Sequence, residues 1–284
     1  MILHTLGVAG SAPSPQSAAS TYLVQVTAAA VVAGIAAGTV LDDVEVRDWN
    51  LVMDLGSGGL GPLQGAITLD RIDAVAISHL HPDHCADVCG LYVHLKYHPV
   101  FGAMHTGTPA RLPVYGPANT ATRIAQMYGL HDGETMEPIL DFRAFADGGT
   151  VRLGPLTIET RLVFHPVETF GMRITGPSTV RPGEAAVLAY TGDTDYCESV
   201  VELARDADVL LAESAFVQGR DDRVGIGIHL NGASAGRVAR EAGARRLVLT
   251  HIPAWTDPMV VLDEAATEYH GSMVLAAPRG AVRL

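Results

Sequence analysis

The segment 78–85, SHLHPDHC, concentrates side chains that bind metal ions. It holds three histidines and one aspartate within six positions, namely His79, His81, Asp83 and His84. The first two histidines are two residues apart, so in an extended backbone both rings can point to the same side. Pro82 stiffens the turn that follows, and the last two ligands project from its far side. Because neutral imidazole together with carboxylate suits Zn²⁺, Mn²⁺ or Fe²⁺, this segment predicts a metal centre.

Further ligand-type side chains follow apolar runs that are typical of buried strands. Runs rich in valine, isoleucine and leucine predict strands at 50–54, 73–78, 112–115, 156–164, 185–190, 209–212 and 246–250. Five of these runs lead into acidic or imidazole side chains, which are His79, His165, Asp193, Glu213 and His251. The C-terminal ends of strands are where α/β sheets place their sites. One ion could not use all these ligands and keep a position open for water, whereas two adjacent ions bridged by a carboxylate could, so we predict two metals.

The elements that must position these ligands alternate along the chain. Helical patterns are predicted at 87–97, 118–127, 196–204 and 233–242, and the last is followed by Gly243, a natural helix end. Strands that alternate with helices indicate a layered α/β fold. Since no repeat or low-complexity linker divides the chain, we expect a single domain over residues 1–284.

Composition narrows the classes of function. The chain has 284 residues, of which 48% are hydrophobic, which is enough for a substantial core. Its formal net charge of -12 argues against non-specific nucleic-acid binding, because such binding depends on lysine and arginine releasing counterions. The negative net charge is still compatible with a small anionic substrate, since bound cations make the electrostatic potential positive locally. Three cysteines without a paired framework, and a start that lacks a signal-peptide pattern, predict a cytoplasmic location.

One segment near the N-terminus carries no formal charge from Thr5 to Leu41. It is long enough to span a bilayer, but its Ala, Gly and Thr content and the alternating start TYLVQV favour a strand, so we expect no membrane span. We predict a hairpin with an apolar insertion near 27–49, whose connection is enlarged by Ala28 to Gly38. An exposed apolar connection of this size could also form a homodimer contact.

The motifs SHLHPDHC, VFHPVETFGMRI, YTGDT and LVLTHIPAW, with the Gly-rich MDLGSGGLGPLQ, resemble those of the metallo-β-lactamase fold hydrolases over essentially the whole chain. The resemblance implies a four-layer αββα sandwich that binds two divalent ions, with Zn²⁺ expected and Mn²⁺ or Fe²⁺ as alternatives. It implies three ligands for a first ion, three for a second and one bridging aspartate: His79, His81 and His165; Asp83, His84 and His251; and Asp193.

Other motifs narrow the subgroup. HPVETFGMRI, LLAESAF and IHLNGASAGRVAREAG resemble the tRNase Z-like branch, which implies that Glu213 and His229 assist proton transfer from outside the metal shell. Only about 20 residues separate Arg173 from Asp193, which leaves no room there for the long arm that grips tRNA in that branch. LYVHLKYHP, PVYGPANT and LTHIPAWT resemble the actinobacterial members described as cyclic-nucleotide phosphodiesterases.

We therefore expect that the protein hydrolyses a small phosphodiester. The best candidate is 3′,5′-cyclic AMP, which would be converted to 5′-AMP. Two cations can make water a nucleophile near neutral pH and stabilise the charge on phosphoryl oxygens. Asp83 would orient that water, and His229, held by Glu213, would donate a proton to the leaving alkoxide. The alternative for His229 is a role in capping the helix that starts near Asn231.

Three other functions stay open at this point. A tRNase Z-like ribonuclease would need a basic strip or arm, and neither is visible in the sequence. A thioester or lactone hydrolase of the same fold usually carries an HTPGH-type segment, where this chain has HPVETFG. A metal-binding scaffold without activity would not need the complete ligand set that the chain retains.

Overall fold

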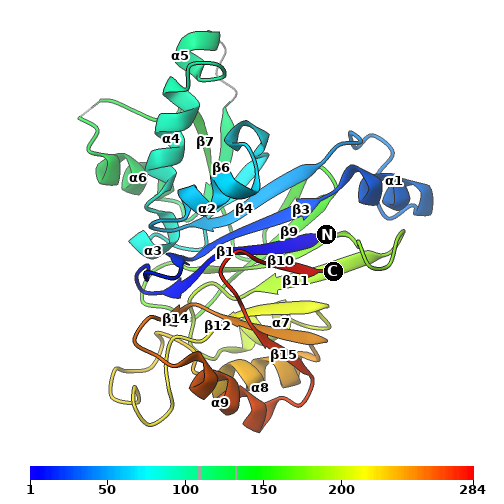
Figure 1. The fold of residues 1–284 in the computed structure, drawn as a ribbon, viewed down its shortest axis with the longest axis vertical. Helices are drawn as coiled ribbons and strands as arrows, with labels where there is room; N and C mark the ends of the chain where they lie inside the picture. Colours follow the sequence, from blue (N-terminus) through cyan, green and yellow to red (C-terminus); the bar gives the residue numbers. More distant parts are fainter. Residues whose placement is uncertain (108–110, 132) are drawn as a thin grey trace.

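The computed structural model describes residues 1–107, 111–131 and 133–284, and two β-sheets pack face to face in it (Figure 1). Helices cover the outer face of each sheet. This is the predicted four-layer αββα arrangement. The N- and C-terminal strands run side by side, so the two ends of the chain meet in the same sheet (Figure 1).

The first sheet contains nine strands within the described residues. They are β1 (Ile2–Gly10), β2 (Ala18–Ala19), β3 (Thr21–Val26), β4 (Trp49–Leu55), β5 (Ala74–Ala76), β6 (Leu112–Gly116), β7 (Leu140–Ala144), β14 (Ile252–Pro253) and β16 (Gly280–Arg283). The order is β14-β1-β3-β4-β5-β6-β7, and β2 and β16 both pair with β1. Because β4 to β7 are mutually parallel, their C-terminal ends lie at one edge of the sheet.

The second sheet contains seven strands within the same described ranges. They are β8 (Thr150–Leu153), β9 (Leu156–Leu162), β10 (Phe170–Pro177), β11 (Ala185–Tyr190), β12 (Val209–Glu213), β13 (Arg246–Thr250) and β15 (Ser272–Leu275), in the order β15-β13-β12-β11-β10-β9-β8. β11, β12 and β13 are parallel, and β9 points the same way because both β9 and β11 are antiparallel to β10. β15 is parallel to β13 as well, so five strands of this sheet end at one edge.

The helices are α1 (Ala28–Ala37), α2 (Leu60–Ala66), α3 (Pro82–Cys85), α4 (Val88–Tyr97), α5 (Ala103–Thr106), α6 (Thr120–Tyr128), α7 (Glu198–Leu203), α8 (Gly232–Ala242) and α9 (Pro258–Glu268), with a 3₁₀ turn, η1, at Leu69–Arg71.

Three apolar clusters hold the layers together. One cluster, with Met53 and Tyr190, lies between the sheets. A second lies under α2, α4 and α6, and the third lies under α7, α8 and α9. Each large buried aliphatic side chain contributes roughly 1.5–3 kcal/mol.

Most predicted elements are present with small changes at their ends. The predicted strands at 185–190 and 246–250 coincide with β11 and β13, and the four predicted helices correspond to α4, α6, α7 and α8. The strand predicted at 73–78 is shorter than expected, because β5 ends at Ala76. Beyond it, the Ser78 amide donates to the side-chain carboxylate of Asp54 on β4 (2.7 Å) instead of to a backbone carbonyl of a neighbouring strand.

The insertion near the N-terminus contains a helix that the sequence pattern did not predict. β3 and β4 pair antiparallel as the predicted hairpin requires, and α1 lies in the connection between them. Thr27 caps its start, and it ends at Gly38, whose φ of 74° is the left-handed conformation that favours glycine. None of the helices in the described residues is long and apolar enough to cross a membrane. Val32 on α1 is exposed, and the homodimer contact there stays a prediction.

Candidate metal centre

The ligand-bearing segments of both sheets converge where the parallel strands end. From the first sheet, the segment after β5 and the short helix α3 supply His79, His81, Asp83 and His84. From the second sheet, the segments after β9, β11 and β13 supply His165, Asp193 and His251. In Figure 1 the labels of α3 and β14 accordingly lie at the same end of the molecule. All seven residues that the resemblance implies as ligands are brought together.

Four of these side chains form a first group, His79, His81, His165 and Asp193, whose ligand atoms all lie within 4.8 Å of one another. His81 Nδ1 lies 3.0 Å from His79 Nε2 and 3.4 Å from His165 Nε2. Asp193 Oδ2 lies 3.7 Å from His79 Nε2. Three imidazole nitrogens that face one another beside a carboxylate form a typical site for one divalent cation.

A second group shares Asp193 and contains Asp83, His84 and His251. His84 Nε2 lies 3.2 Å from Asp193 Oδ1 and 3.5 Å from Asp83 Oδ2. His251 Nε2 lies 3.3 Å from Asp193 Oδ2. Because Asp193 belongs to both groups, its carboxylate is placed to bridge two ions.

Two atoms show that these residues fit metal ions. His84 Nε2 and Asp193 Oδ1 are buried, and neither has a hydrogen-bond partner among the described residues. Buried polar atoms without partners are rare in proteins, because losing water without a new bond costs free energy. Cation binding would satisfy both atoms, and nitrogen with carboxylate oxygen is a suitable donor set for Zn²⁺ or Mn²⁺.

Burial keeps most of the histidines neutral, as metal ligation requires. Burial lowers the pKa of His79 well below its usual range, and it also lowers the pKa of His251. His84 is the exception: burial opposes its protonation, but the carboxylates of Asp193 and Asp54 outweigh burial and raise its pKa. His84 is therefore the one ligand ring whose proton a bound cation would displace.

Most metal-facing rings are held by a bond at their other nitrogen. His84 Nδ1 lies 2.8 Å from Asp54 Oδ2, and His251 Nδ1 lies 2.9 Å from Ser20 Oγ. His165 Nδ1 donates to the Ile228 carbonyl oxygen (2.8 Å). Such partners fix the orientation and tautomer of a ligand histidine.

Asp54 is the functional residue that the sequence reasoning missed. It is fully buried at the end of β4 with a φ of 50°. Its carboxylate accepts hydrogen bonds from the Ser78 amide and hydroxyl and from Tyr190 Oη (2.7–2.8 Å), besides the bond to His84. The signal was available, because Asp54 is an acidic residue at the end of a predicted strand, like the ligands themselves.

Glu213 and His229 lie next to the bridging aspartate. His229 Nδ1 lies 2.8 Å from Glu213 Oε1 and 3.8 Å from Asp193 Oδ2. The Glu213 carboxylate also accepts hydrogen bonds from the backbone amides of Thr194, Leu230 and Ala215. These bonds fix the carboxylate in place, so it is suited to holding His229. The capping alternative for His229 is wrong, because the Asn231 side chain caps α8.

Burial opposes protonation of His229, but Glu213 outweighs burial and raises the pKa of His229 to about 9. The ring therefore carries a proton at neutral pH. A buried carboxylate beside a protonated imidazole is the arrangement of a general acid with its orienting partner.

The fold and this site together define a metallo-hydrolase of the metallo-β-lactamase fold. The family profile described as the beta-lactamase superfamily domain matches residues 54–252, so the chain belongs to that superfamily. The match runs from Asp54 to the residue after His251 and so contains every predicted ligand.

Three proteins of other organisms are similar to this chain. Uncharacterized protein Rv1339 of Mycobacterium tuberculosis is 39% identical over 271 residues, covering 95% of this chain and 87% of that protein. The probable metallo-hydrolase YhfI of Bacillus subtilis is 31% identical over 279 residues, covering 97% of each. The crystal structure of YhfI matches with a TM-score of 0.75 at 28% identity, over 100% of this chain and 98% of that chain. Ribonuclease Z of Myxococcus xanthus is 28% identical over 272 residues, covering 80% of this chain and 85% of that protein. The chain is thus a tRNase Z-like member of the superfamily.

Proposed function

We propose that this protein hydrolyses small phosphodiesters and that 3′,5′-cyclic AMP, converted to 5′-AMP, is its substrate. The observation that carries the proposal is the Glu213–His229 pair beside Asp193, because neither of its residues belongs to the two groups of four ligands and His229 is left to act as a proton donor. A ribose alkoxide is a poor leaving group and needs such a donor. The resemblance of the sequence to cyclic-nucleotide phosphodiesterases supports the choice of cyclic AMP.

Bound divalent cations would supply a water-derived nucleophile at neutral pH and stabilise the charge on the phosphoryl oxygens. His79, His81 and His165 would hold one ion, Asp83, His84 and His251 the other, and Asp193 both. Burial alone would raise the pKa of Asp83, but His84 outweighs burial and lowers it to about 2. Asp83 is thus ionised and able to orient the attacking water by accepting a hydrogen bond.

The leaving group departs as a new bond to phosphorus forms. The water oxygen bonds to phosphorus, and one of its protons passes to solvent, from which His229 is later reprotonated. The bond from phosphorus to O3′ breaks, and O3′ keeps the electron pair. His229 donates its proton to O3′, while the bond from Nδ1 to Glu213 Oε1 holds the ring in place. The product is a nucleoside 5′-monophosphate.

The structure argues against tRNA as the substrate of this chain. Only residues 178–184 connect β10 to β11, so this connection holds no long arm. The net charge of -12 would also repel a polyanion. The name ribonuclease Z therefore describes the Myxococcus xanthus relative and not the activity that we propose for this protein.

The proposal is tested by a comparison of substrates. Protein loaded with Zn²⁺ or Mn²⁺ is assayed against cyclic AMP, a glutathione thioester and a precursor tRNA, and we expect metal-dependent turnover of cyclic AMP alone. Asp83→Ala should abolish this turnover, whereas Asp43→Ala, which removes an exposed carboxylate, should not change it. Turnover of the thioester or the tRNA, without cyclic AMP hydrolysis, would contradict the proposal.

The role of His229 is tested by the leaving group. His229→Ala should lower the turnover of cyclic AMP by roughly 10²- to 10⁴-fold, because the alkoxide then leaves without a proton. The turnover of bis(p-nitrophenyl) phosphate should fall much less, because p-nitrophenolate is a good leaving group and needs no proton. Equal losses on both substrates would show that His229 acts elsewhere in the reaction.

A further inference from the structure

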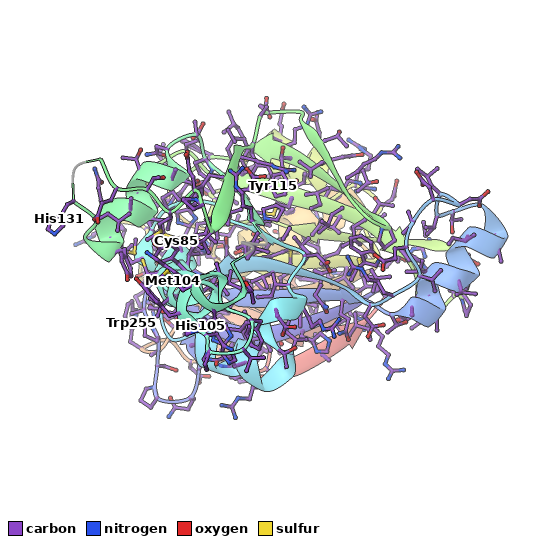
Figure 2. The ribbon with its side chains drawn as sticks, turned by 90° about the horizontal axis from the view of Figure 1, so that it is seen from above. Cys85, Met104, His105, Tyr115, His131 and Trp255 are labelled. Atoms are coloured by element: carbon purple, nitrogen blue, oxygen red, sulfur yellow. The ribbon has the colours of Figure 1, made fainter. Side chains whose placement is uncertain are left out.

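Trp255 is an exposed aromatic side chain close to the metal centre in sequence. It follows His251 by four residues, and 69% of it is exposed. Figure 2 places Trp255 at the same end of the molecule as Cys85, the residue after His84. The other tryptophan, Trp49, lies at the opposite end of β4 from Asp54, where the Arg47 guanidinium packs on its ring.

The backbone on both sides of Trp255 is held rigidly. Ile252 and Pro253 pair with the end of β1, and the Thr256 amide donates to the Pro253 carbonyl oxygen (2.9 Å). Asp257 then caps α9 through the Met259 amide (2.9 Å). The backbone that carries the indole is therefore held in place, which lowers the entropy cost of using it to bind a ligand.

The loop of residues 217–228 lies beside this segment and leads into His229. It is tied to the Trp255 segment by the hydrogen bond from Arg220 Nη1 to Thr256 Oγ1 (3.0 Å). Its two arginines are matched by two aspartates, so it presents no net charge to a polyanion. Its most exposed apolar side chain is Ile226, at 87%.

A third exposed apolar side chain flanks the metal centre. Phe164, which precedes His165, is 47% exposed, and its ring packs against Gly227, where a methyl group would lie 2.6 Å from Phe164 Cζ. The segments that carry His165, His229 and His251 thus each expose an apolar side chain. We call Phe164, Ile226 and Trp255 the apolar rim.

We propose that Trp255 is the specificity-determining residue that stacks on the nucleobase of the substrate. The inference rests on the proposed function, which places the phosphate at the metal centre and directs the remainder of the nucleotide outward. An apolar rim with an open indole suits a flat aromatic ring and not a second anion. Stacking uses the π-face that every base has and does not read its edge. Cyclic AMP and cyclic GMP should therefore bind similarly, and both should bind better than the smaller cyclic CMP.

Fluorescence tests the contact without turnover. In Trp49→Phe, Trp255 is the sole tryptophan, and the metal-loaded protein is titrated with AMP and with ribose 5-phosphate. We expect saturable quenching by AMP and none by ribose 5-phosphate, which has the same phosphate but no base. Equal responses to both compounds would overturn the inference, even if the wild-type protein hydrolyses cyclic AMP as proposed.

Kinetics test the consequence for specificity. Trp255→Ala should raise the KM for cyclic AMP roughly 5- to 150-fold with little change in kcat, and Trp255→Phe should recover most of the loss. Met104→Ala, which removes an exposed side chain from α5, is the matched control and should leave the KM unchanged. If Trp255→Ala keeps the nucleotide KM and instead changes the oligomeric state in solution, Trp255 belongs to a protein contact and the inference is wrong.

Discussion

At the scale of single residues, Asp54 organises the metal centre without being one of its predicted ligands. One carboxylate oxygen accepts a hydrogen bond from the Ser78 amide, and the other lies within hydrogen-bonding distance of His84 Nδ1 (2.8 Å) and Tyr190 Oη (2.7 Å). These contacts link β4 of the first sheet to the ligand segment and to β11 of the second sheet. A buried charge with this many partners is satisfied only when all of them are in place.

We therefore expect Asp54→Asn to weaken metal binding by about 10- to 100-fold, because the amide no longer supplies a charged acceptor for His84. Competition with a metal chelator measures the change. Asp73→Asn is a suitable control, since Asp73 accepts the Asn50 amide (2.7 Å) at the other end of the β4–β5 pair. The control should lose stability but keep its metal affinity, and equal loss of metal in both variants would contradict the role of Asp54.

The predicted ligands and the missed partners differ in a physical way. His79, Asp193 and His251 could be predicted because ligand-type side chains at strand ends are unusual in sequence and are brought together by parallel pairing. Ser20 and Ser78 could not, because a serine beside a strand is common and its function depends on one hydrogen bond in three dimensions. Asp54 lies between these cases, since its type and position were visible but its partners were not.

At the scale of elements, the turn that carries Asp83 rests on the backbone after β4. A methyl group on Gly56 would overlap the Asp83 carbonyl oxygen, so only glycine allows this approach. The Gly56 amide also donates to the carbonyl oxygen of Ser20, the residue before β3 (3.0 Å), which ties the same point to the start of that strand. The position of Asp83 therefore depends on the contact between α3 and the residue after β4.

We expect Gly56→Ala to move Asp83 and to lower turnover by roughly 10²-fold, since a displacement of about 1 Å can have that effect. It should also destabilise the fold by about 1–3 kcal/mol through overpacking. Gly65→Ala is the matched substitution in α2, where a new methyl group meets nothing within 4 Å among the described residues. It should stabilise the fold by about 0.4–1 kcal/mol. Thermal unfolding and turnover measurements on both variants test these two predictions. Similar effects from the two substitutions would contradict the role of Gly56.

The elements that could be predicted are those whose own residues decide them. β11 and β13 are short apolar runs between polar turns, and α8 ends at Gly243, which adopts a φ of 67°. α1 could not be predicted, because a stretch of alanine, valine and glycine has no polar face to reveal a helical period. α3 is a single turn after His81, too short for any periodicity.

At the scale of the whole molecule, the metal centre lies between two sheets that would otherwise meet through apolar packing. The first sheet supplies His79 to His84, and the second supplies His165, Asp193 and His251. Besides burial, the Asp193 carboxylate opposes the ionisation of Asp83, so without cations these two carboxylates repel each other at this junction. Metal ions would remove that repulsion and link the sheets, so the centre is also a structural feature.

Metal binding should therefore control global stability. A ligand that binds only the folded state at about 100 times its Kd stabilises it by about 2.7 kcal/mol, so removing Zn²⁺ with a chelator should lower the Tm by several degrees. His251→Ala should show a much smaller response to chelator, because it lacks a ligand from the second sheet, whereas His270→Ala, which changes an exposed side chain, should respond like the wild type. Scanning calorimetry with and without chelator measures the shift. A Tm that is the same in both conditions for the wild-type protein would mean that the two groups do not bind ions tightly, and it would remove the basis of the proposed chemistry.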